Sequence, residues 1–314
     1  MSTEKNRTLK MVAVPAIKGE MEQRFRPLLN TVEDATGLKI SFQEALSYDD
    51  AIAELVTGKA QLGWLGQSAY IKAAKKIDLE PLGVAFTEGV DESVYRTVFL
   101  TKAASKYSSL TDLKGQRLIL TEHGSTSGDT MPRHILAQFD LNPDIHGNFS
   151  DVIYAGSQEE AVKHLLAGKG DVVAVSQINL EKMFQDKTLD KNDMKIIYRS
   201  DPIPGGPIVH LASLPEDLKK QLRQAILNAH HTGRVDGYGE HVESYHTPED
   251  ARLNFLNSYL KPAVGFTTIV LLTGFVISTI GVAVHLNINP ITIFESFSYF
   301  SDIISRMIPP DFSN

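Results

Sequence analysis

The sequence predicts an α/β protein of two lobes, followed by one membrane-spanning helix near the C-terminus. Short apolar runs alternate with helical stretches from residue 8 to about residue 250, as is typical of α/β folds. Two similar units, at 53–64 and 164–175, each consist of a helix end, a Gly-Lys turn and a strand. Residues 264–284 form an uncharged apolar run as long as a bilayer core is thick.

The part of the chain before residue 70 predicts three strands and two helices. Gly37 and Gly58 close the two helices, because glycine readily adopts the left-handed conformation found after a helix. In chain order, we expect a strand at 9–15, a helix at 20–36, a strand at 38–45, a helix at 49–57 and a buried strand at 60–66.

The remainder of the α/β part predicts further strands and helices around a glycine- and hydroxyl-rich turn at 124–130. We expect strands at 95–102, 113–120, 150–156, 170–176 and 194–200, and helices at 131–139, 158–167 and 215–230.

The elements divide into two lobes. The prediction places residues 8–98 and 205–250 in lobe 1 and residues 99–204 in lobe 2, with crossing segments near 96–101 and 200–207. A cleft between lobes is a favoured place for a small-molecule site, so we expect the ligand there.

Composition excludes several classes of function. The chain has 314 residues, a formal net charge of −7 and no cysteine. Nucleic acid is therefore not an expected partner, and disulfide scaffolds, thiolate metal sites and cysteine nucleophiles are excluded. The ten histidines lack metal-ligand spacing, and no phosphate-binding glycine motif for a nucleotide is present. We expect no metal and no cofactor.

The C-terminal part predicts contact with a membrane. Residues 264–284 are expected to form a transmembrane helix, with a buried soluble helix as the alternative, and residues 290–308 an amphipathic interfacial helix. The first twenty residues contain no apolar run typical of a secretory signal. Arg252 and Lys261 precede the span, and this charge bias favours a cytoplasmic position for the lobes.

The run from Gly124 to Gly128 carries the clearest chemical signal. Ser125, Thr126 and Ser127 follow a strand and precede a helix. Hydroxyls and exposed amides at the start of a helix form a neutral anion site. Helix capping by serine or threonine is the alternative interpretation of the same pattern.

Three aromatic residues form a second candidate group. Tyr48 precedes a helix, Trp64 lies between Gly63 and Gly66, and Tyr95 begins a strand. Tyrosine hydroxyls are suitable donors to a phosphoryl oxygen. Core packing is the alternative for each of the three.

Four ordered motifs carry a family resemblance. S-T-S-G before a helix, G-W-L-G followed by A-Y, Y-R-T-V-F-L and I-P-G-G-P-I-V resemble the phosphonate/phosphite-binding proteins of ABC importers. The resemblance implies a type 2 periplasmic-binding-protein fold with an interlobe cleft, and an ABC permease and its ATPase as partners. It also implies an oxyanion held at Ser125, Thr126 and Ser127, with Tyr48, Trp64 and Tyr95 lining the cleft.

Departures from the family pattern narrow the expected ligand. At positions where aminoalkylphosphonate receptors carry acidic residues, this chain has Ile178 and Gly206, and an ammonium group without a carboxylate is costly to bury. Where some relatives have a histidine, it has Ser157 and Gln158, which we expect to bind the ligand together with Gln67. The expected ligand is phosphite, methylphosphonate or phosphate.

The predicted function is that of a solute receptor which delivers this oxyanion to a permease and is not an enzyme. A membrane-tethered sensor of phosphorus oxyanions is the alternative. A phosphonate-processing enzyme is disfavoured, because no nucleophile with a base or a metal is evident. The C-terminal part resembles the start of the phosphonate permease subunit. The family implies an extracytoplasmic binding domain, and we expect a single-pass protein of the cell membrane in that orientation.

Overall fold

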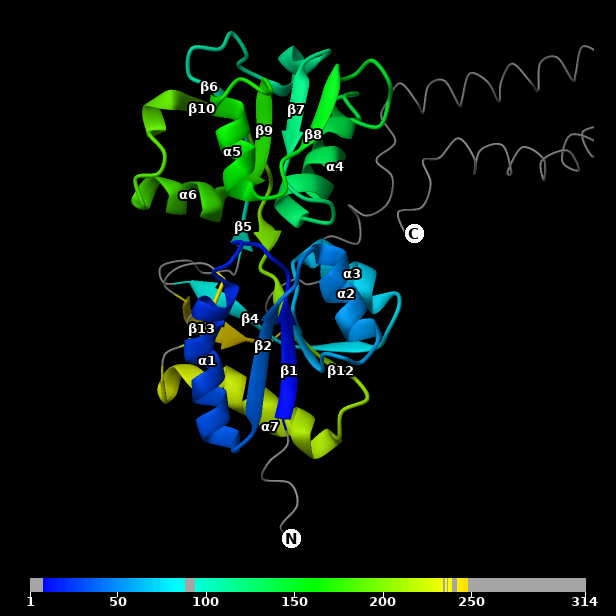
Figure 1. Cartoon of the computed structure of the whole chain (residues 1–314), viewed down its shortest axis with the longest axis vertical. Coiled ribbons are helices and arrows are strands. Elements are labelled where there is room, and N and C mark those ends of the chain that lie inside the picture. Colours follow the sequence, from blue (N-terminus) through cyan, green and yellow to red (C-terminus); the bar gives the residue numbers. More distant parts are fainter. Residues whose placement is uncertain (1–7, 88–93, 234, 236, 239–241, 248–314) are drawn as a thin grey trace, which may run out of the picture.

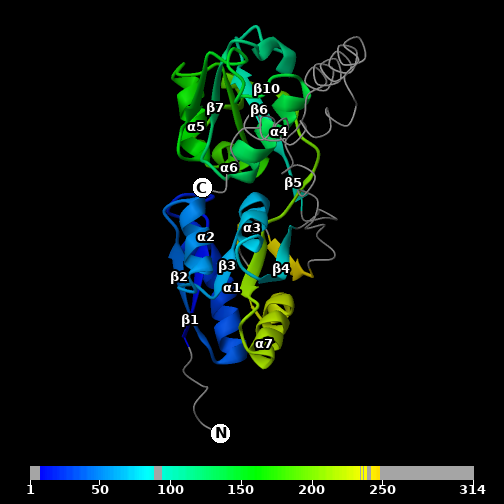
Figure 2. The same cartoon turned by 90° about the vertical axis from the view of Figure 1, so that its right-hand side faces the viewer.

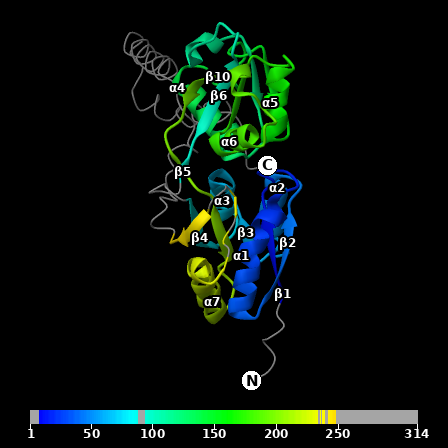
Figure 3. The same cartoon turned by 90° about the vertical axis from the view of Figure 1, so that its left-hand side faces the viewer.

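The computed structural model describes residues 8–87, 94–233, 235, 237–238 and 242–247. Its elements form two α/β bodies, each built on one mixed sheet, and Figures 1, 2 and 3 show them stacked end to end. The predicted transmembrane helix at 264–284 and the interfacial helix at 290–308 lie outside the described residues. No helix within the described ranges is long and apolar enough to cross a bilayer.

The first body is built on a six-stranded sheet with the order β13-β4-β12-β3-β1-β2. β1 pairs in parallel with β2 and β3, whereas β12 and β13 run antiparallel to their neighbours. The strands are β1 (Thr8–Ala13), β2 (Lys39–Glu44), β3 (Leu62–Trp64), β4 (Leu79–Thr87), β12 (Pro207–Leu211) and β13 (Val242–His246). The helices are α1 (Met21–Thr36), α2 (Tyr48–Val56), α3 (Gln67–Ala74) and α7 (Glu216–Leu227).

The second body is built on a five-stranded sheet with the order β10-β6-β9-β7-β8. Here β7 pairs in parallel with β8 and β9, and β6 pairs antiparallel with both β9 and β10. The strands are β6 (Thr97–Lys102), β7 (Arg117–Leu120), β8 (Asp151–Tyr154), β9 (Val172–Ser176) and β10 (Met194–Arg199). The helices are α4 (Met131–Gln138), α5 (Gln158–Leu166) and α6 (Gln177–Gln185), and a π-helical turn, Thr126–Thr130, precedes α4.

Two crossing segments connect the bodies. β5 (Val94–Tyr95) and β11 (Ile203–Pro204) pair antiparallel in a small sheet of their own between them (Figure 1). The strand expected at 95–102 is therefore interrupted at Arg96, where the chain passes from one sheet to the next. β6 begins two residues before the predicted start of lobe 2, and the division into lobes at 98/99 and 204/205 stays a prediction.

Several expected elements differ from the structure. The strand expected at 113–120 is shorter, because Leu110–Leu113 form a 3-10 turn and only Arg117–Leu120 pair in the sheet. The sequence patterns did not predict β4, β13, α3, α6 or β12, and β11 lies within the crossing segment expected near 200–207. All five residues of β12 are buried.

The cores hold each sheet in place, and the carboxyl ends of the parallel strands indicate where a ligand would bind. One apolar cluster surrounds the first sheet, and two clusters cover the faces of the second. Parallel strands with helical connections present their carboxyl ends to one side, where ligands of α/β sheets bind. In this chain the carboxyl ends of β3 and β9 are Trp64 and Ser176, and both lie near the meeting place of the two bodies.

Candidate functional site

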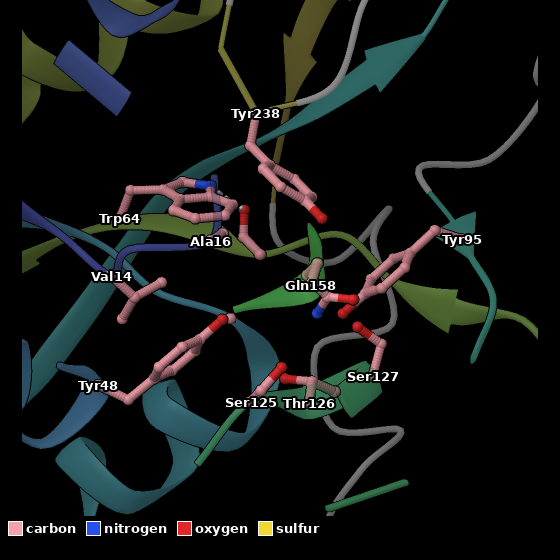
Figure 4. Close-up of a pocket in the computed structure, with 12 residues that line it drawn as sticks. Val14, Ala16, Tyr48, Trp64, Tyr95, Ser125, Thr126, Ser127, Gln158 and Tyr238 are labelled. Carbon is pink, nitrogen blue, oxygen red and sulfur yellow. Dashed lines mark hydrogen bonds between the residues drawn. The ribbon is translucent and has the colours of Figure 1, made fainter. Parts of the chain in front are cut away.

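A small cavity lies between the two bodies, and its space of about 330 Å³ includes open solvent at its mouth. Both bodies and β5 contribute to its wall, as Figure 4 shows. The lining residues are Val14, Ala16, Tyr48, Trp64, Gly66, Tyr95, Ser125, Thr126, Ser127, Gln158, Gly206 and Tyr238. None of these described lining residues carries a formal charge. Its hydroxyl-rich, uncharged lining fits a small polar ligand.

Seven of the nine predicted binding residues line this cavity. They are Tyr48, Trp64, Tyr95, Ser125, Thr126, Ser127 and Gln158. Whether they bind a ligand stays a prediction, but their convergence from distant parts of the chain is a feature of the structure.

The other two predicted residues are outside the cavity wall. The Ser157 hydroxyl accepts a hydrogen bond from the Glu160 amide at 3.1 Å and so caps α5. Gln67 is fully buried at the start of α3, where its Nε2 donates to the Gly205 carbonyl at 2.8 Å. Its Oε1 has no hydrogen-bond partner in the part of the chain that the structure describes. Both side chains therefore have a structural task at a helix start.

Hydroxyl groups form one side of the cavity, which we call the polar floor (Ser125, Thr126 and Ser127). The Ser125 hydroxyl oxygen accepts from the Gly128 amide at 3.2 Å, and the Thr126 hydroxyl oxygen accepts from the Ser68 amide at 3.1 Å. Because both oxygens accept from the backbone, their protons are available for other acceptors. The amides of Thr126 and Ser127 belong to a first helical turn, where N–H groups have no partner within the helix.

Two tyrosines face the polar floor. Burial raises the pKa of the Tyr48 hydroxyl well above its ordinary value, while the neighbouring Ser125 hydroxyl acts to lower it. Burial likewise raises the pKa of Tyr95, against the effect of the Thr126 and Ser127 hydroxyls. Both phenols therefore stay protonated at neutral pH and are donors toward an anion.

A buried ion pair supports the polar floor from behind. Asp129 accepts the Gly124 amide at 2.9 Å, Arg133 Nε at 2.7 Å and the Tyr154 hydroxyl at 2.7 Å. Arg133 also contacts Asp144. Burial acts to lower the pKa of the Arg133 guanidinium, but the charge of Asp129 raises it above its ordinary value. The guanidinium thus neutralises a carboxylate that would otherwise repel an anion nearby.

Gly128 is required by the packing of this loop. A Cβ at this position would lie 1.9 Å from the Thr121 hydroxyl oxygen. Any larger residue would displace the turn that presents Ser125, Thr126 and Ser127.

The opposite side of the cavity is aromatic, and we call it the aromatic roof (Trp64 and Tyr238). The two rings lie 4.8 Å apart between centroids. The indole N–H of Trp64 donates to the Gly206 carbonyl at 3.0 Å, so it is not available to a ligand.

The hydroxyl of Tyr238 is also occupied by protein groups. Asn179 Nδ2 donates to the Ala16 carbonyl at 3.1 Å, which leaves Asn179 Oδ1 as an acceptor. Tyr238 donates its only hydroxyl proton to this Oδ1 at 2.7 Å, and Ser176 Oγ lies 3.3 Å from the same hydroxyl. The aromatic roof therefore offers no free donor among its described atoms.

Gln158 is fixed as a donor toward the cavity. The Ser176 amide donates to its Oε1 at 2.8 Å. This contact orients the side-chain amide, so that its NH₂ group is the end left for a ligand (Figure 4).

Sequence reasoning missed Tyr238, Val14, Ala16 and Gly66 as cavity residues. Val14 and Ala16 follow the first strand at its carboxyl end, and this position was the available signal. Tyr238 lies after the last helix, where no strand or helix pattern marked it.

A protein family and several known proteins are similar to this chain. The sequence model of a family described as the periplasmic substrate-binding protein of phosphonate ABC transporters matches residues 12–251. The phosphate-import protein PhnD of Mycolicibacterium smegmatis is 25% identical over 207 residues, which are 63% of this chain and 64% of that protein. The phosphonates-binding periplasmic protein of Escherichia coli is 26% identical over 214 residues, covering 66% of this chain and 62% of that protein.

The alignments span a little less than two thirds of the length of these two relatives. Among solved structures, PhnD1 from Prochlorococcus marinus in complex with methylphosphonate has a TM-score of 0.67 at 16% identity and covers 81% of this chain and 97% of that chain. At such an identity the likeness concerns the fold, which is the mixed α/β fold of periplasmic binding proteins. With a family model matched over most of its length, the chain belongs to the phosphonate-binding family of periplasmic substrate-binding proteins of ABC transporters.

Proposed function

We propose that this protein is the solute-binding component of an ABC importer and that it binds a small phosphorus oxyanion in the cavity between its two bodies. The observation that carries the proposal is the convergence of neutral donors on one side of a small cavity whose other side is aromatic. In this proposal the closed receptor delivers the ligand to a permease with its ATPase, from the extracytoplasmic side. A membrane tether at 264–284 rests on the sequence alone.

The polar floor suits an oxyanion without a counter-charge. Three phosphoryl oxygens can be surrounded by five hydroxyls and one side-chain amide. The hydroxyls are those of Tyr48, Tyr95, Ser125, Thr126 and Ser127, and the amide is that of Gln158. Each hydroxyl can also accept, so a protonated P–OH group of a monoanion is tolerated. Hydrogen bonds to charged groups contribute about 1.5–3 kcal/mol each, enough in sum for tight binding.

The aromatic roof favours phosphite or methylphosphonate over phosphate. The fourth substituent of the phosphorus would point away from the polar floor, toward Trp64 and Tyr238. Both rings have their polar hydrogens bound to protein groups. A fourth oxygen would therefore lose its hydration without a donor, at a cost of about 1–3 kcal/mol, whereas hydrogen or methyl would not.

An aminoalkyl substituent is disfavoured by the same wall. A Cβ at Gly206 would lie 2.4 Å from the Leu65 carbonyl oxygen, so the backbone here cannot accommodate an acidic side chain without moving. Ile178 is not among the lining residues. An ammonium group would therefore be buried with no carboxylate partner from either position.

Calorimetric titration of the full chain in detergent with phosphite, methylphosphonate, phosphate and 2-aminoethylphosphonate tests the proposal. We expect tight binding of phosphite or methylphosphonate, weaker binding of phosphate and the weakest binding of 2-aminoethylphosphonate. Ser127→Ala should weaken the binding. The unmodified protein should bind the ligand without converting it. A folded chain that binds none of the four ligands contradicts the assignment. Co-purification with a permease and an ATPase tests the transport role.

A further inference from the structure

Tyr238 spans the cleft between the two bodies. Its ring packs on the core of the first body and lies tilted by 35° against the ring of Trp64 at the end of β3. Its hydroxyl bonds to Asn179 of α6 and lies within hydrogen-bond distance of Ser176 at the end of β9, both in the second body. One side chain is thus held by the two bodies at once.

The bonds of Tyr238 depend on the closure of the cleft. Asn179, which accepts the Tyr238 hydroxyl proton, also donates to the Ala16 carbonyl in the first body. The two bodies are further joined by the bond from the Ser68 amide to Thr126. If the bodies separate, Asn179 and Ser176 move away from the ring, and the hydroxyl loses both neighbours.

The Tyr238 hydroxyl is buried between the two bodies, and this burial changes its pKa. It raises the pKa of Tyr238 to about 12, against the effect of the Ser176 hydroxyl. The phenol is therefore neutral at physiological pH, and its only proton is committed to Asn179. Tyr238 thus faces the cavity with its ring and not with a donor.

We propose that Tyr238 is a specificity-determining residue that limits the length of the substituent on the phosphorus, and that it reaches this position only when the cleft closes. The proposal rests on the proposed function. A substituent directed away from Ser125, Thr126 and Ser127 meets the ring that Asn179 and Ser176 hold in place (Figure 4). A longer chain would have to push the ring aside and break the bonds between the bodies.

The test compares methylphosphonate with propylphosphonate by calorimetry on the full chain in detergent. The unmodified protein should bind methylphosphonate at least about tenfold more tightly, since even one surplus methylene in a fitted pocket changes affinity by that order. Tyr238→Ala should reduce this ratio at least about fivefold by opening the end of the cavity. If Tyr238→Ala does not fold, as judged by circular dichroism, Tyr238→Leu carries the same expectation.

Tyr238→Phe separates the ring from the hydroxyl. The ring remains, so the ratio between the two ligands should stay within about twofold, while both affinities fall about two- to tenfold through the lost hydrogen bonds. Tyr107→Phe is the matched control, because Tyr107 loses a hydroxyl bond to Gln116 of 2.6 Å but does not line the cavity. It should change neither affinity.

The outcomes separate this inference from the proposed function. An unchanged ratio in Tyr238→Ala, or an unmodified protein that binds both ligands equally well, overturns the role of Tyr238 and leaves the oxyanion site intact. A folded protein that binds neither ligand overturns the proposed function and this inference with it.

Discussion

The two bodies contain helices that begin in the same way but present different chemistry to the cavity. In α2, the Ser47 hydroxyl accepts from the Asp50 amide at 3.1 Å, and Tyr48 is the first helical residue. In α5, the Ser157 hydroxyl accepts from the Glu160 amide at 3.1 Å, and Gln158 is the first helical residue. Each serine caps its helix, and each following residue is buried and lines the cavity.

The difference between Tyr48 and Gln158 lies in how their hydrogen-bonding groups are fixed. The phenol of Tyr48 can donate or accept, because its hydroxyl rotates to suit its neighbour. The amide of Gln158 is oriented by the Ser176 amide, so only its NH₂ end is available. The comparison indicates that the capping serine aims the helix start, while the next residue determines what the site can bind.

The largest expected effect comes from replacing the NH₂ group of Gln158, a donor, with an acceptor. Gln158→Glu keeps the shape but replaces the NH₂ group with a carboxylate oxygen facing the anion. Like charges placed together in a desolvated site cost several kcal/mol, so we expect the affinity for methylphosphonate to fall about 100-fold or more at pH 8. Calorimetric titration of the folded variant measures this.

Gln158→Met is the control for this variant, because it removes the donor and adds no charge. Its loss should be clearly smaller than that of the glutamate. Equal losses in the two variants would mean that the NH₂ group does not face the ligand.

Tyr48→Phe should have the next largest effect. It removes one donor to a charged ligand and leaves the ring, and such bonds contribute about 1.5–3 kcal/mol, or roughly 10- to 100-fold in affinity. Titration with methylphosphonate checks it, with Tyr107→Phe as the matched control away from the cavity. An unchanged affinity would make Tyr48 a packing residue only, which is the alternative left open by its sequence.

The sequence was sufficient for the residues whose chemistry is local. Ser125, Thr126 and Ser127 lie between a strand and a helix, and this order is visible in the sequence. A helix start after a strand is a common place for an anion site, so the sequence could predict these residues as candidates. Ser157 and Gln67 are outside the cavity wall, and the sequence could not show this, because polar side chains at a helix start can bond to the protein as well as to a ligand. Only the contacts with Glu160 and Gly205 distinguish these roles.

Tyr238 could not be found by such patterns. Its position depends on Trp64, Ser176 and Asn179, which come from three different elements far from it in sequence. Long-range packing of this kind leaves no periodicity in the surrounding residues. The fold class, by contrast, follows from alternation of strands and helices, which is a local property of the chain.

A smaller effect is expected from Glu122, beside the start of α2. Burial raises the pKa of its carboxyl group from 4.5 to about 7, against the effects of the Tyr48 amide and Lys18. Above pH 7 the ionised carboxylate adds a negative charge near the anion. We expect the affinity of the unmodified protein to fall about threefold more between pH 6 and pH 8 than that of Glu122→Gln. The ligand's own titration is common to both proteins.

The raised pKa of Glu122 should also make the folding stability fall as the pH rises. The folded pKa lies above the unfolded value, so the folded state holds a proton that the unfolded state releases between pH 4.5 and pH 7. Folding stability from this group is present below pH 4.5 and is lost as the pH rises to 7. Denaturant unfolding across this range should show a flatter pH profile for Glu122→Gln. Parallel profiles for the two proteins would contradict the assigned shift.

The smallest effect on binding is expected at the two capping serines, which test the comparison most directly. Ser47→Ala and Ser157→Ala each remove one cap and should lower the free energy of unfolding by about 1 kcal/mol. Because neither hydroxyl lines the cavity, the affinity for methylphosphonate should stay within about twofold in both variants. Denaturant unfolding and calorimetry on the same samples measure the two quantities. If Ser157→Ala instead loses affinity tenfold at unchanged stability, Ser157 binds the ligand. The two helix starts are then not equivalent, because Ser47 caps its helix while Ser157 contacts the ligand.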